Sequence, residues 1–549
     1  MRKALLVHPH DDVGVALTDS NHGELIPVQD QHSDLVSDVR AKHKFALRDF
    51  ALGDQIRMYD VIVGVAKVPI AKGEVLTTFN VTHESESFST EGREKYHWEA
   101  PDISRFDGRT FDGFHRSDGQ VGTGNHWLVF PMVFCENRNI ETIKKAFEKG
   151  LGLEPADPYT ALVHQLVDKY ENNELSESAD FKLAAEDSPS QQPRIFENID
   201  GIRFLTHHAG CGGTRQDAET LCRLLAGYIN NPNVAGATVL SLGCQNAQSE
   251  MLEDALKAVN PKLDKPVLIY DQQQTGTERE LIKNAITGTF MALVEANKQT
   301  REPAPLSKLC IGLECGGSDG FSGISANPSV GYVSDLIVAL GGKAILSEFP
   351  ELCGVEQELI NRAVRQEDAE RFAQLMRAYE HAAAEVGSGF DMNPSPGNIK
   401  DGLITDAMKS AGAAKKGGTS PVSGVLDYTE YAVAPGLNLL CTPGNDVEST
   451  TGLAGSGANI ILFTTGLGTP TGNPVTPVLK VASNTQLSER MPDIIDIDTG
   501  AIIRGESSIE EMGEEMLEYI MEVASGRKAS KAMTLGQYDF IPWKRGVSL

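Results

Sequence analysis

Residues 201–243, GIRFLTHHAGCGGTRQDAETLCRLLAGYINNPNVAGATVLSLG, contain a strand pattern, a helical pattern and a second strand pattern in direct succession. GIRFLTHH and GATVLSLG are short and rich in apolar residues, whereas QDAETLCRLLAGYI between them has apolar residues at helical spacing. The alternation continues to residue 299 through the strand PVLIYDQQ and two further helices. A repeated strand–helix order predicts a parallel sheet flanked by helices, which is the α/β fold class.

A second alternating region lies between residues 308 and 526. It begins with the strand KLCIGLECGG and the helix VGYVSDLIVALGGK, and it continues with the strands AILSEFP, GLNLLCT and NIILFTT. Residues 356–386 have apolar side chains at i, i+3 and i+4 spacing, which predicts one long helix. The region therefore predicts a second set of parallel strands.

The start of the chain has a different sequence pattern. Short apolar runs such as LLVH, VGVAL and QIRMYDVIVGVA alternate with Gly, Asp and Asn turns, which predicts a small β module. An acidic, Ser-rich stretch at residues 171–194 predicts an exposed excursion. The predicted domains are the β module at 1–83, a polar linker at 84–112, a central α/β domain at 113–392 and a C-terminal α/β domain at 393–549.

The charge balance excludes several classes of partner. The chain has 76 acidic and 49 basic residues, a formal net charge of −27, and such a surface repels nucleic acid. No apolar stretch approaches the roughly 20 residues that cross a bilayer, and the start of the chain lacks a signal-peptide pattern. We therefore expect a cytoplasmic protein that acts on a small molecule, without nucleic-acid or membrane partners. The oligomeric state stays open, and a homo-oligomer is one of the alternatives.

The eight cysteines are dispersed and contain no CxxC pair, which disfavours a zinc ribbon, and a long chain expected in the cytoplasm disfavours a disulfide framework. Buried small hydrophobic side chains are the ordinary interpretation of such cysteines. An iron–sulfur cluster held by three of them stays open as an alternative. The cysteines are Cys135, Cys211, Cys222, Cys244, Cys310, Cys315, Cys353 and Cys441.

Polar residues recur just after the predicted strands. In α/β proteins the carboxyl ends of parallel strands form the usual place for a binding site. One such loop alone indicates only a turn, but several of them combine Gly with Cys, His, Asp or Glu and predict a shared site. The candidates in these loops are His207, Cys211, Glu314, Ser318, Asp319, Asn445 and Asp446.

Several long sequence blocks, taken together, resemble the altronate/galactarate dehydratase family. They include KHKFALRDF (42–50), GQVGTGNHWLVFPMVFC (119–135), GLECGGSDGFSGISANP (312–328), TPGNDVESTTGLAGSGANIILFTTGLGTPTG (442–472) and the ending KRGVSL. These blocks span nearly the whole chain, and their order resembles the altronate type more than the galactarate type.

The resemblance implies an N-terminal SAF-type β module, a central α/β domain and a C-terminal Rossmann-like domain. It also implies a hydro-lyase that converts D-altronate to 2-keto-3-deoxy-D-gluconate with the help of Fe²⁺ or Mn²⁺. Such chemistry needs a base for the proton beside the carboxylate, an acid for the departing 3-hydroxyl and a cation for the developing charge. The alternatives are a galactarate dehydratase, a lyase for another hydroxy acid, and a small-molecule-binding protein.

The matching blocks also suggest roles for individual residues. His43, Asp11 and His207 are the predicted catalytic residues, because each could take up or donate a proton. The predicted substrate-binding residues are Asn125, Glu314, Ser318, Asp319, Asn445 and Asp446. The predicted metal ligands are His8, Asp11, His43 and Cys211.

Three positions depart from the family pattern. Gly124 and Leu467 stand where the family usually has Arg, and Gln245 stands in place of a Glu. Arg binds carboxylates through two parallel hydrogen bonds, so its absence removes partners for a second substrate carboxylate. The two missing Arg residues predict a preference for monoacids such as altronate over diacids such as galactarate.

Overall fold

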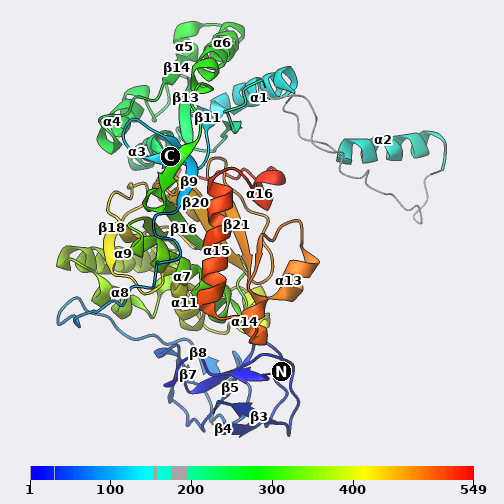
Figure 1. Cartoon of the computed structure of the whole chain (residues 1–549), viewed down its shortest axis with the longest axis vertical. Helices are drawn as coiled ribbons and strands as arrows, with labels where there is room; N and C mark the ends of the chain where they lie inside the picture. The colour runs from blue at the N-terminus through cyan, green and yellow to red at the C-terminus, as the bar shows by residue number, and fades with distance from the viewer. Residues whose placement is uncertain (1, 30, 153–157, 175–194, 549) are drawn as a thin grey trace.

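The computed structural model describes residues 2–29, 31–152, 158–174 and 195–548. Figure 1 shows strands β1 to β8 at one end of the chain's long axis, a seven-stranded sheet in the middle and a four-stranded sheet toward the other end. The predicted α/β fold with an N-terminal β module is confirmed. Residues 175–194, which contain most of the predicted acidic excursion, lie outside the described residues.

The N-terminal β module consists of short antiparallel strands, as the alternation of apolar runs and turns predicted. β1 (Ala4–Leu5), β2 (Val13–Ala16) and β5 (Lys44–Ala46) form one sheet, β3 (Leu25–Val28) pairs with β4 (Gln31–Asp34), and β6 (Gln55–Met58), β7 (Val61–Ala66) and β8 (Val81–Thr82) form another. Val13, Phe45 and Phe50 are buried within the module. Burial of these side chains supplies the free energy that such short strands need.

The predicted linker is an extended segment fastened to the seven-stranded domain. Arg93 Nη1 donates to the carbonyl oxygens of Ile360 and Ala363 at 3.0 and 2.7 Å. Tyr96 Oη donates to the carbonyl oxygen of Thr419 at 2.5 Å. These hydrogen bonds satisfy backbone groups of the domain, so the linker is part of its surface rather than a free connection.

The central domain contains a four-stranded parallel sheet in the order β12-β11-β13-β14. Its strands are β11 (His126–Pro131), β12 (Gly201–Phe204), β13 (Val234–Ser241) and β14 (Val267–Asp271). The helices that accompany it include α1 (Asn137–Leu151), α3 (Arg215–Asn230), α4 (Ser249–Val259) and α6 (Glu278–Ala296). The strand–helix alternation predicted for residues 201–299 is thereby confirmed.

The second parallel sheet has the strand order β18-β19-β17-β16-β20-β21-β22. Its strands are β16 (Cys310–Cys315), β17 (Lys343–Leu346), β18 (Val422–Leu426), β19 (Gly436–Leu440), β20 (Ile460–Thr465), β21 (Val478–Ala482) and β22 (Ile497–Asp498). Helices packed around it include α7 (Ala326–Ala339), α11 (Asp406–Ala413), α12 (Asp446–Gly455) and α15 (Ile509–Ala524). Strands β16, β17, β19 and β20 are apolar and almost fully buried, as expected of a parallel sheet covered on both faces.

The predicted domain boundary between residues 392 and 393 does not separate two folding units. β16 and β17 precede it, yet they pair with β20 and β19, which follow it. Strand patterns along the sequence do not reveal which sheet a strand joins, because that choice depends on contacts between distant residues. The second sheet therefore begins at Cys310, well before the predicted boundary.

The long helix predicted over residues 356–386 is broken into two. α8 (Glu356–Arg362) ends before Ala363, and α9 (Gln366–Glu385) begins three residues later. At the break Ala363 pairs with Val422 as an isolated parallel bridge, and Val364 N donates to the carbonyl oxygen of Val422 at 2.9 Å. Tertiary pairing with the edge strand β18 thus overrides the helical periodicity.

The β module and the two ends of the chain dock closely on the other domains. One apolar core runs from Val63 and Met58 of the module to Met408 of α11, and Thr405 Oγ1 donates to the carbonyl oxygen of Val63 at 2.6 Å. The C-terminal tail runs to the central domain beside α3 (Figure 1). Among the helices of the described residues, none is both long and apolar enough to cross a membrane.

Candidate active site

The carboxyl ends of β16, β17, β19 and β20 bring polar side chains to one edge of the seven-stranded sheet. Parallel strands end at a common edge, so loops that are distant in the sequence meet there. Glu314, Asp319 and Asp446, three of the predicted substrate-binding residues, lie in or just after these strands. Glu348 follows β17 with a φ of 66°, a left-handed conformation that is rare and strained for a residue other than glycine.

Two lysines and two glutamates form a buried ionic cluster at this edge. Lys416 Nζ lies 2.7 Å from Glu348 Oε2, and Lys409 Nζ lies 2.5 Å from Glu351 Oε1. Cys315 joins them, because its Sγ accepts from Lys416 Nζ at 2.7 Å and donates to Glu351 Oε2 at 3.0 Å. Buried carboxylates are costly unless they are paired, and each of these has an ammonium partner. The ionic cluster of Glu348, Glu351, Lys409 and Lys416 is therefore balanced in charge.

Glu314 is a fully buried carboxyl group beside this cluster. Burial and the neighbouring carboxylate of Glu348 hold its pKa well above the ordinary value. Its Oε2 accepts hydrogen bonds from Ser347 Oγ at 2.9 Å and Ser449 Oγ at 2.5 Å. Its Oε1 has no hydrogen-bond partner among the described residues. Glu314 can therefore donate a proton where an ionised carboxylate could only accept one.

Asp446 is the carboxylate best suited to move protons at neutral pH. It is half-buried at the start of α12, and burial together with the charges of Glu348 and Glu351 raises its pKa to about 7. A side chain at Gly316 would place its Cβ 2.2 Å from Asp446 Oδ2, so a larger residue there would displace the Asp446 carboxylate. A general acid or base works best when its pKa lies near the working pH.

The β module reaches the same edge through Lys42. Lys42 Nζ lies 3.0 Å from Asp319 Oδ2 and 3.2 Å from Asp401 Oδ1. Asp319 is fully buried, and its Oδ1 also accepts from Ser483 Oγ at 2.9 Å. Lys44, two residues further, donates to the carbonyl oxygen of Gly402 at 2.7 Å, and burial lowers its pKa to about 7. The module thus contributes two lysine side chains where it closes over the edge.

Of the predicted catalytic residues of the module, Asp11 is buried and His43 is half-buried. His43 is half-buried beside Lys42, its Nδ1 lies 3.2 Å from the carbonyl oxygen of Ala41, and burial lowers its pKa. Asp11 accepts backbone hydrogen bonds from His8 and Asp60 at 3.0 and 3.1 Å, and burial raises its pKa. His43 keeps a position compatible with its predicted role, whereas Asp11 shapes the turn that presents His8.

Ser318 and Asn445, two other predicted substrate-binding residues, lie in loops near the same edge. The carbonyl oxygen of Ser318 accepts from Asn398 Nδ2 at 2.7 Å, and this bond fixes the loop that carries Asp319. Asn445 is exposed and directly precedes α12. Both positions are consistent with binding a ligand at the edge.

Two predicted site residues have structural contacts instead. His207 is buried, its Nε2 lies 2.8 Å from the carbonyl oxygen of Pro131, and its Nδ1 accepts from Ala209 N at 3.1 Å. Both ring nitrogens are engaged by backbone, so we find no nitrogen left for proton transfer. Asn125 is fully buried at the opposite, amino end of β11, where Arg116 Nη2 donates to its Oδ1 at 3.0 Å. Asn125 therefore lies apart from the carboxyl edge of its sheet, and its role in substrate binding stays a prediction.

The predicted ligand set for a divalent ion is not assembled in one place. Cys211 belongs to the central domain, whereas His8, Asp11 and His43 belong to the β module. Among the described residues, three groups have suitable ligand atoms within 4.8 Å of one another. They are His8, His10 and Asp60; His83, Cys353 and Asp406; and Cys315, Glu348 and Glu351.

The chemistry of these groups decides which could accept Fe²⁺ or Mn²⁺. Glu348 and Glu351 are already paired with the ammonium groups of Lys416 and Lys409. A divalent cation would be repelled by these two lysines, so this group does not fit Fe²⁺ or Mn²⁺. His8, His10 and Asp60 offer two imidazoles and a carboxylate, the ligand types that suit both ions. His10 Nδ1 lies 2.9 Å from Asp60 Oδ1. The module group is therefore the better fit.

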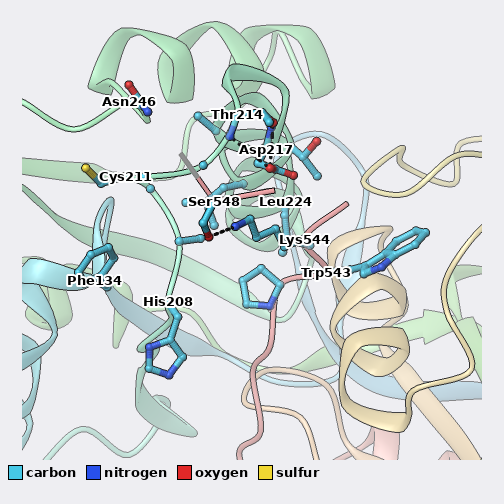
Figure 2. Close-up of a pocket in the computed structure, with 18 of the residues that line it drawn as sticks. Phe134, His208, Cys211, Thr214, Asp217, Leu224, Asn246, Trp543, Lys544 and Ser548 are labelled. Atoms are coloured by element: carbon cyan, nitrogen blue, oxygen red, sulfur yellow. Dashed lines mark hydrogen bonds between the residues drawn. The ribbon is translucent and has the colours of Figure 1, made fainter. Parts of the chain in front are cut away.

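A separate cavity of about 300 Å³ lies between the central domain and the C-terminal tail. Figure 2 shows His208, Cys211 and Asn246 on one side of it, and Trp543 and Lys544 on the other. The tail is fixed there because Gly546 N donates to Asp217 Oδ1 at 3.0 Å. Cys211 thus lines a cavity, but not together with the module residues predicted to share a metal with it.

The ionic cluster was not among the predicted site residues. Glu348 and Glu351 follow the strand AILSEFP, so the same search of strand ends could have found them. Lys409 and Lys416 lie on or after α11, in the sequence MKSAGAAKKGG, where a lysine ordinarily indicates a solvated face. No local pattern distinguishes these two buried lysines from exposed ones.

Three family models together match nearly all of the chain. The altronate/galactarate dehydratase SAF domain matches residues 2–84, the second domain of D-galactarate dehydratase/altronate hydrolase matches residues 113–297, and the C-terminal domain of D-galactarate/altronate dehydratase matches residues 306–548. The last two ranges follow the two parallel sheets of the structure rather than the predicted boundary at 392.

Curated relatives match over similar lengths. An altronate dehydratase of Bacillus subtilis (strain 168) is 33% identical over 528 residues, which cover 96% of each chain. An altronate dehydratase of Escherichia coli (strain K12) is 31% identical and covers 95% of each chain. The galactarate dehydratase (L-threo-forming) of E. coli (strain K12) is 30% identical over 95% of this chain and 92% of the relative.

Proposed function

Because the chain belongs to the altronate/galactarate dehydratase family, we propose that it is a hydro-lyase that removes water from a sugar acid, with D-altronate as its substrate. The product of that reaction is 2-keto-3-deoxy-D-gluconate. The family relatives are dehydratases of both altronate and galactarate, so the choice of altronate rests on the sequence blocks and on Leu467. Galactarate dehydration is the second candidate, favoured by the galactarate relative.

The observation that carries the proposal is that two acids lie in different environments at one sheet edge. Burial and the charges of Glu348 and Glu351 raise the pKa of Asp446 to about 7, and burial beside Glu348 raises the pKa of Glu314 well above its ordinary value. Dehydration requires one group that removes the proton beside the substrate carboxylate and another that protonates the departing hydroxyl. Asp446 is the base in this scheme, since it is the more accessible of the two. Environments that hold two acids in different states are typical of acid–base sites.

The β module completes the binding site in this proposal. The Lys42 side chain is 18% exposed and pairs with two carboxylates. In this proposal its ammonium group also binds the substrate carboxylate. His43 lies directly beside it and is held neutral by burial, which leaves it able to accept a proton. Closure of the module over the edge would exclude water and strengthen these interactions.

A divalent ion, Fe²⁺ or Mn²⁺, remains part of the proposal. His8, His10 and Asp60 are the described residues that would hold it. When bound, the ion would stabilise negative charge that develops beside the substrate carboxylate. Asp11 positions this group, because its carboxylate accepts from the backbone of both His8 and Asp60.

The substrate can be tested with a panel of aldonates and aldarates, supplied with Fe²⁺ or Mn²⁺, and with formation of a 2-keto acid as the readout. We expect turnover of altronate with a higher kcat/KM than galactarate. Turnover of galactarate above that of altronate would replace the proposed substrate. Binding of sugar acids without any 2-keto acid would reject the enzyme assignment.

The metal requirement can be tested by chelation followed by readdition of single ions. We expect turnover to fall with chelation and to return with Fe²⁺ or Mn²⁺, but not with K⁺. Full activity in protein shown by elemental analysis to hold no metal would remove the ion from the mechanism. His10→Ala should weaken Mn²⁺ binding measured by calorimetry, while the exposed His381→Ala should not.

A further inference from the structure

Three cysteines differ from the other five in being exposed. Cys135, Cys211 and Cys244 are exposed, whereas the remaining cysteines are buried. Cysteine is among the most frequently buried residue types, so an exposed one calls for a chemical explanation. These three follow β11, β12 and β13, which are neighbours in the order β12-β11-β13. All three therefore lie at the carboxyl edge of the four-stranded sheet.

The loops that carry these cysteines are joined to one another by backbone hydrogen bonds. Phe134 N donates to the carbonyl oxygen of Ala209 at 3.2 Å, which ties the first loop to the second. Ala247 N donates to the carbonyl oxygen of Gly210 at 3.1 Å, which ties the third loop to the second. Gly210 has a φ of 96°, and a Cβ there would lie 2.1 Å from the carbonyl oxygen of Met132. Only glycine permits this close approach of the loops.

The buried side chains around the loops hold them in place. The side chain of Gln245 donates to Ser241 Oγ at 2.9 Å and accepts from Gly243 N at 2.7 Å, which fixes the loop of Cys244. Asn137 Nδ2 donates to the carbonyl oxygen of His207 at 2.9 Å, which joins the first two loops again. His207, predicted as a catalytic residue, belongs to this framework. Such a framework fixes the backbone that carries the three thiols.

The electrostatic setting favours negatively charged ligands. Helices α1, α3 and α4 begin at Asn137, Arg215 and Ser249, each within five residues of one of the cysteines. The amino end of a helix carries partial positive charge, which favours an anion bound in front of it. Three such ends meet at this edge, although the chain as a whole has a net charge of −27.

We propose that Cys135, Cys211 and Cys244 hold an iron–sulfur cluster of the four-iron type, with one iron that has no cysteine ligand. A single ion needs its ligands close together, and these three sulfurs are not among the groups of described residues whose ligand atoms lie within 4.8 Å. A four-iron cluster separates its cysteine ligands more widely, because each sulfur binds a different iron. Binding requires that each thiol release its proton to solvent as its sulfur binds iron.

The open iron would face the cavity shown in Figure 2. Cys211 lines this cavity, and Phe134 and Asn246, which are close in sequence to the other two cysteines, line it as well. His208 and Lys544 add groups that can bind a carboxylate. The ligand class that fits is a small hydroxy acid, which can offer both a hydroxyl and a carboxylate oxygen. It would bind here at a second site, separate from the seven-stranded edge where dehydration is proposed. The choice of a sugar acid as this ligand rests on the proposed function, whereas the cluster itself does not.

The cluster can be tested directly by purifying the full chain without oxygen and supplying sulfide with ferrous and ferric iron in equal amounts, because the oxidised resting cluster contains both ions in equal number. We expect about four iron and four acid-labile sulfide per chain, together with a broad visible absorption that dithionite bleaches. Cys135→Ser, Cys211→Ser and Cys244→Ser should each lose most of the iron, the sulfide and the absorption. Cys222→Ala, which changes a buried thiol on α3 in the same domain, should retain all three signals.

Several outcomes would contradict the proposal of a cluster. Iron without sulfide, iron retained in all three serine variants, or a disulfide between two of the cysteines in anaerobic protein would each do so. His10→Ala should leave the cluster unchanged, because its site lies in the β module. If the cluster forms but altronate does not alter its electron paramagnetic resonance spectrum after reduction, the ligand assignment fails and the cluster stands. If the wild-type chain dehydrates altronate but holds no cluster after this treatment, the proposed function stands and the cluster fails.

Discussion

In both parallel sheets polar loops gather where the strands end, but the two edges carry different chemical groups. At the seven-stranded sheet the charged groups are buried and paired, as with Lys416 and Glu348, and the pKa of Asp446 is raised to about 7. At the four-stranded sheet the thiols of Cys135 and Cys211 are exposed, and His207 is bound on both sides by backbone. Burial, rather than residue type, separates an edge suited to proton transfer from an edge suited to soft metal ligands.

The largest effect should come from removing one charge of the ionic cluster. Lys416→Met leaves Glu348 buried without its ammonium partner, and we expect the free energy of unfolding to fall by about 3–5 kcal/mol. Denaturant unfolding would measure this change. Lys298→Met, which breaks an exposed pair with Glu295, should have no measurable effect. Equal stability of the two variants would mean that the cluster is not buried as the structure shows.

Asp446→Asn tests whether the seven-stranded edge carries the proton transfer. Asparagine keeps the size of the side chain but cannot accept a proton, so we expect kcat for altronate to fall about 1,000-fold. The matched control is Glu448→Gln on the same helix, a half-buried carboxyl with no assigned role in the reaction, which should keep kcat within about twofold. Near-normal kcat in Asp446→Asn would move the base to another residue.

His43→Ala and His207→Ala compare a predicted catalytic residue of the β module with one of the central sheet. We expect His43→Ala to lower kcat at least about 100-fold without unfolding the chain, a typical loss for a proton-transfer residue. His207→Ala should instead lower stability by about 1–3 kcal/mol, because the carbonyl of Pro131 loses its partner. Steady-state kinetics and thermal unfolding of both variants would separate these roles. The reverse pattern would restore His207 as the catalytic residue and reject His43.

The pH dependence should report Asp446 in both activity and stability. If Asp446 is the base, kcat/KM should fall about tenfold per pH unit below its pKa of about 7. A carboxyl whose pKa is raised by folding from 3.8 to about 7 destabilises the folded chain increasingly as pH rises through that interval. Asp446→Asn should therefore gain stability relative to the wild type between pH 3.8 and 7, with no further gain above it. A stability difference that does not change with pH would show that the pKa is not shifted.

The smallest effect concerns the choice between monoacids and diacids. Leu467 follows β20, its carbonyl oxygen accepts from Arg490 Nη2 at 3.3 Å, and it lies beside Gly317 at the active edge. Leu467→Arg should raise kcat/KM for galactarate relative to altronate about fivefold, because a second carboxylate gains a partner. Gly124 lies at the amino end of β11, where a Cβ would come 2.8 Å from His126 Nε2. Gly124→Arg should therefore reduce stability without changing specificity, and a change in specificity would contradict this placement.

The order of strands and helices was readable from the sequence because it depends on local periodicity. Residues 201–243 predicted β12, α3 and β13, and the short alternating runs before residue 84 predicted the β module. The rule that polar residues follow parallel strands also found Glu314, Asp319 and Asp446. Their proximity follows from the order of the strands in the sheet. The sequence predicted parallel strands but not that order.

Tertiary structure alone decided which strands share a sheet and which polar groups are buried. The pairing of β16 with β20 joins residues on both sides of the predicted boundary, and the bridge between Ala363 and Val422 divides a helix that periodicity had favoured. Lys409 and Lys416 became site residues only because the chain encloses them beside Glu348 and Glu351. Periodicity is encoded between neighbours in the sequence, whereas burial and charge pairing arise from residues that meet only after the chain has folded.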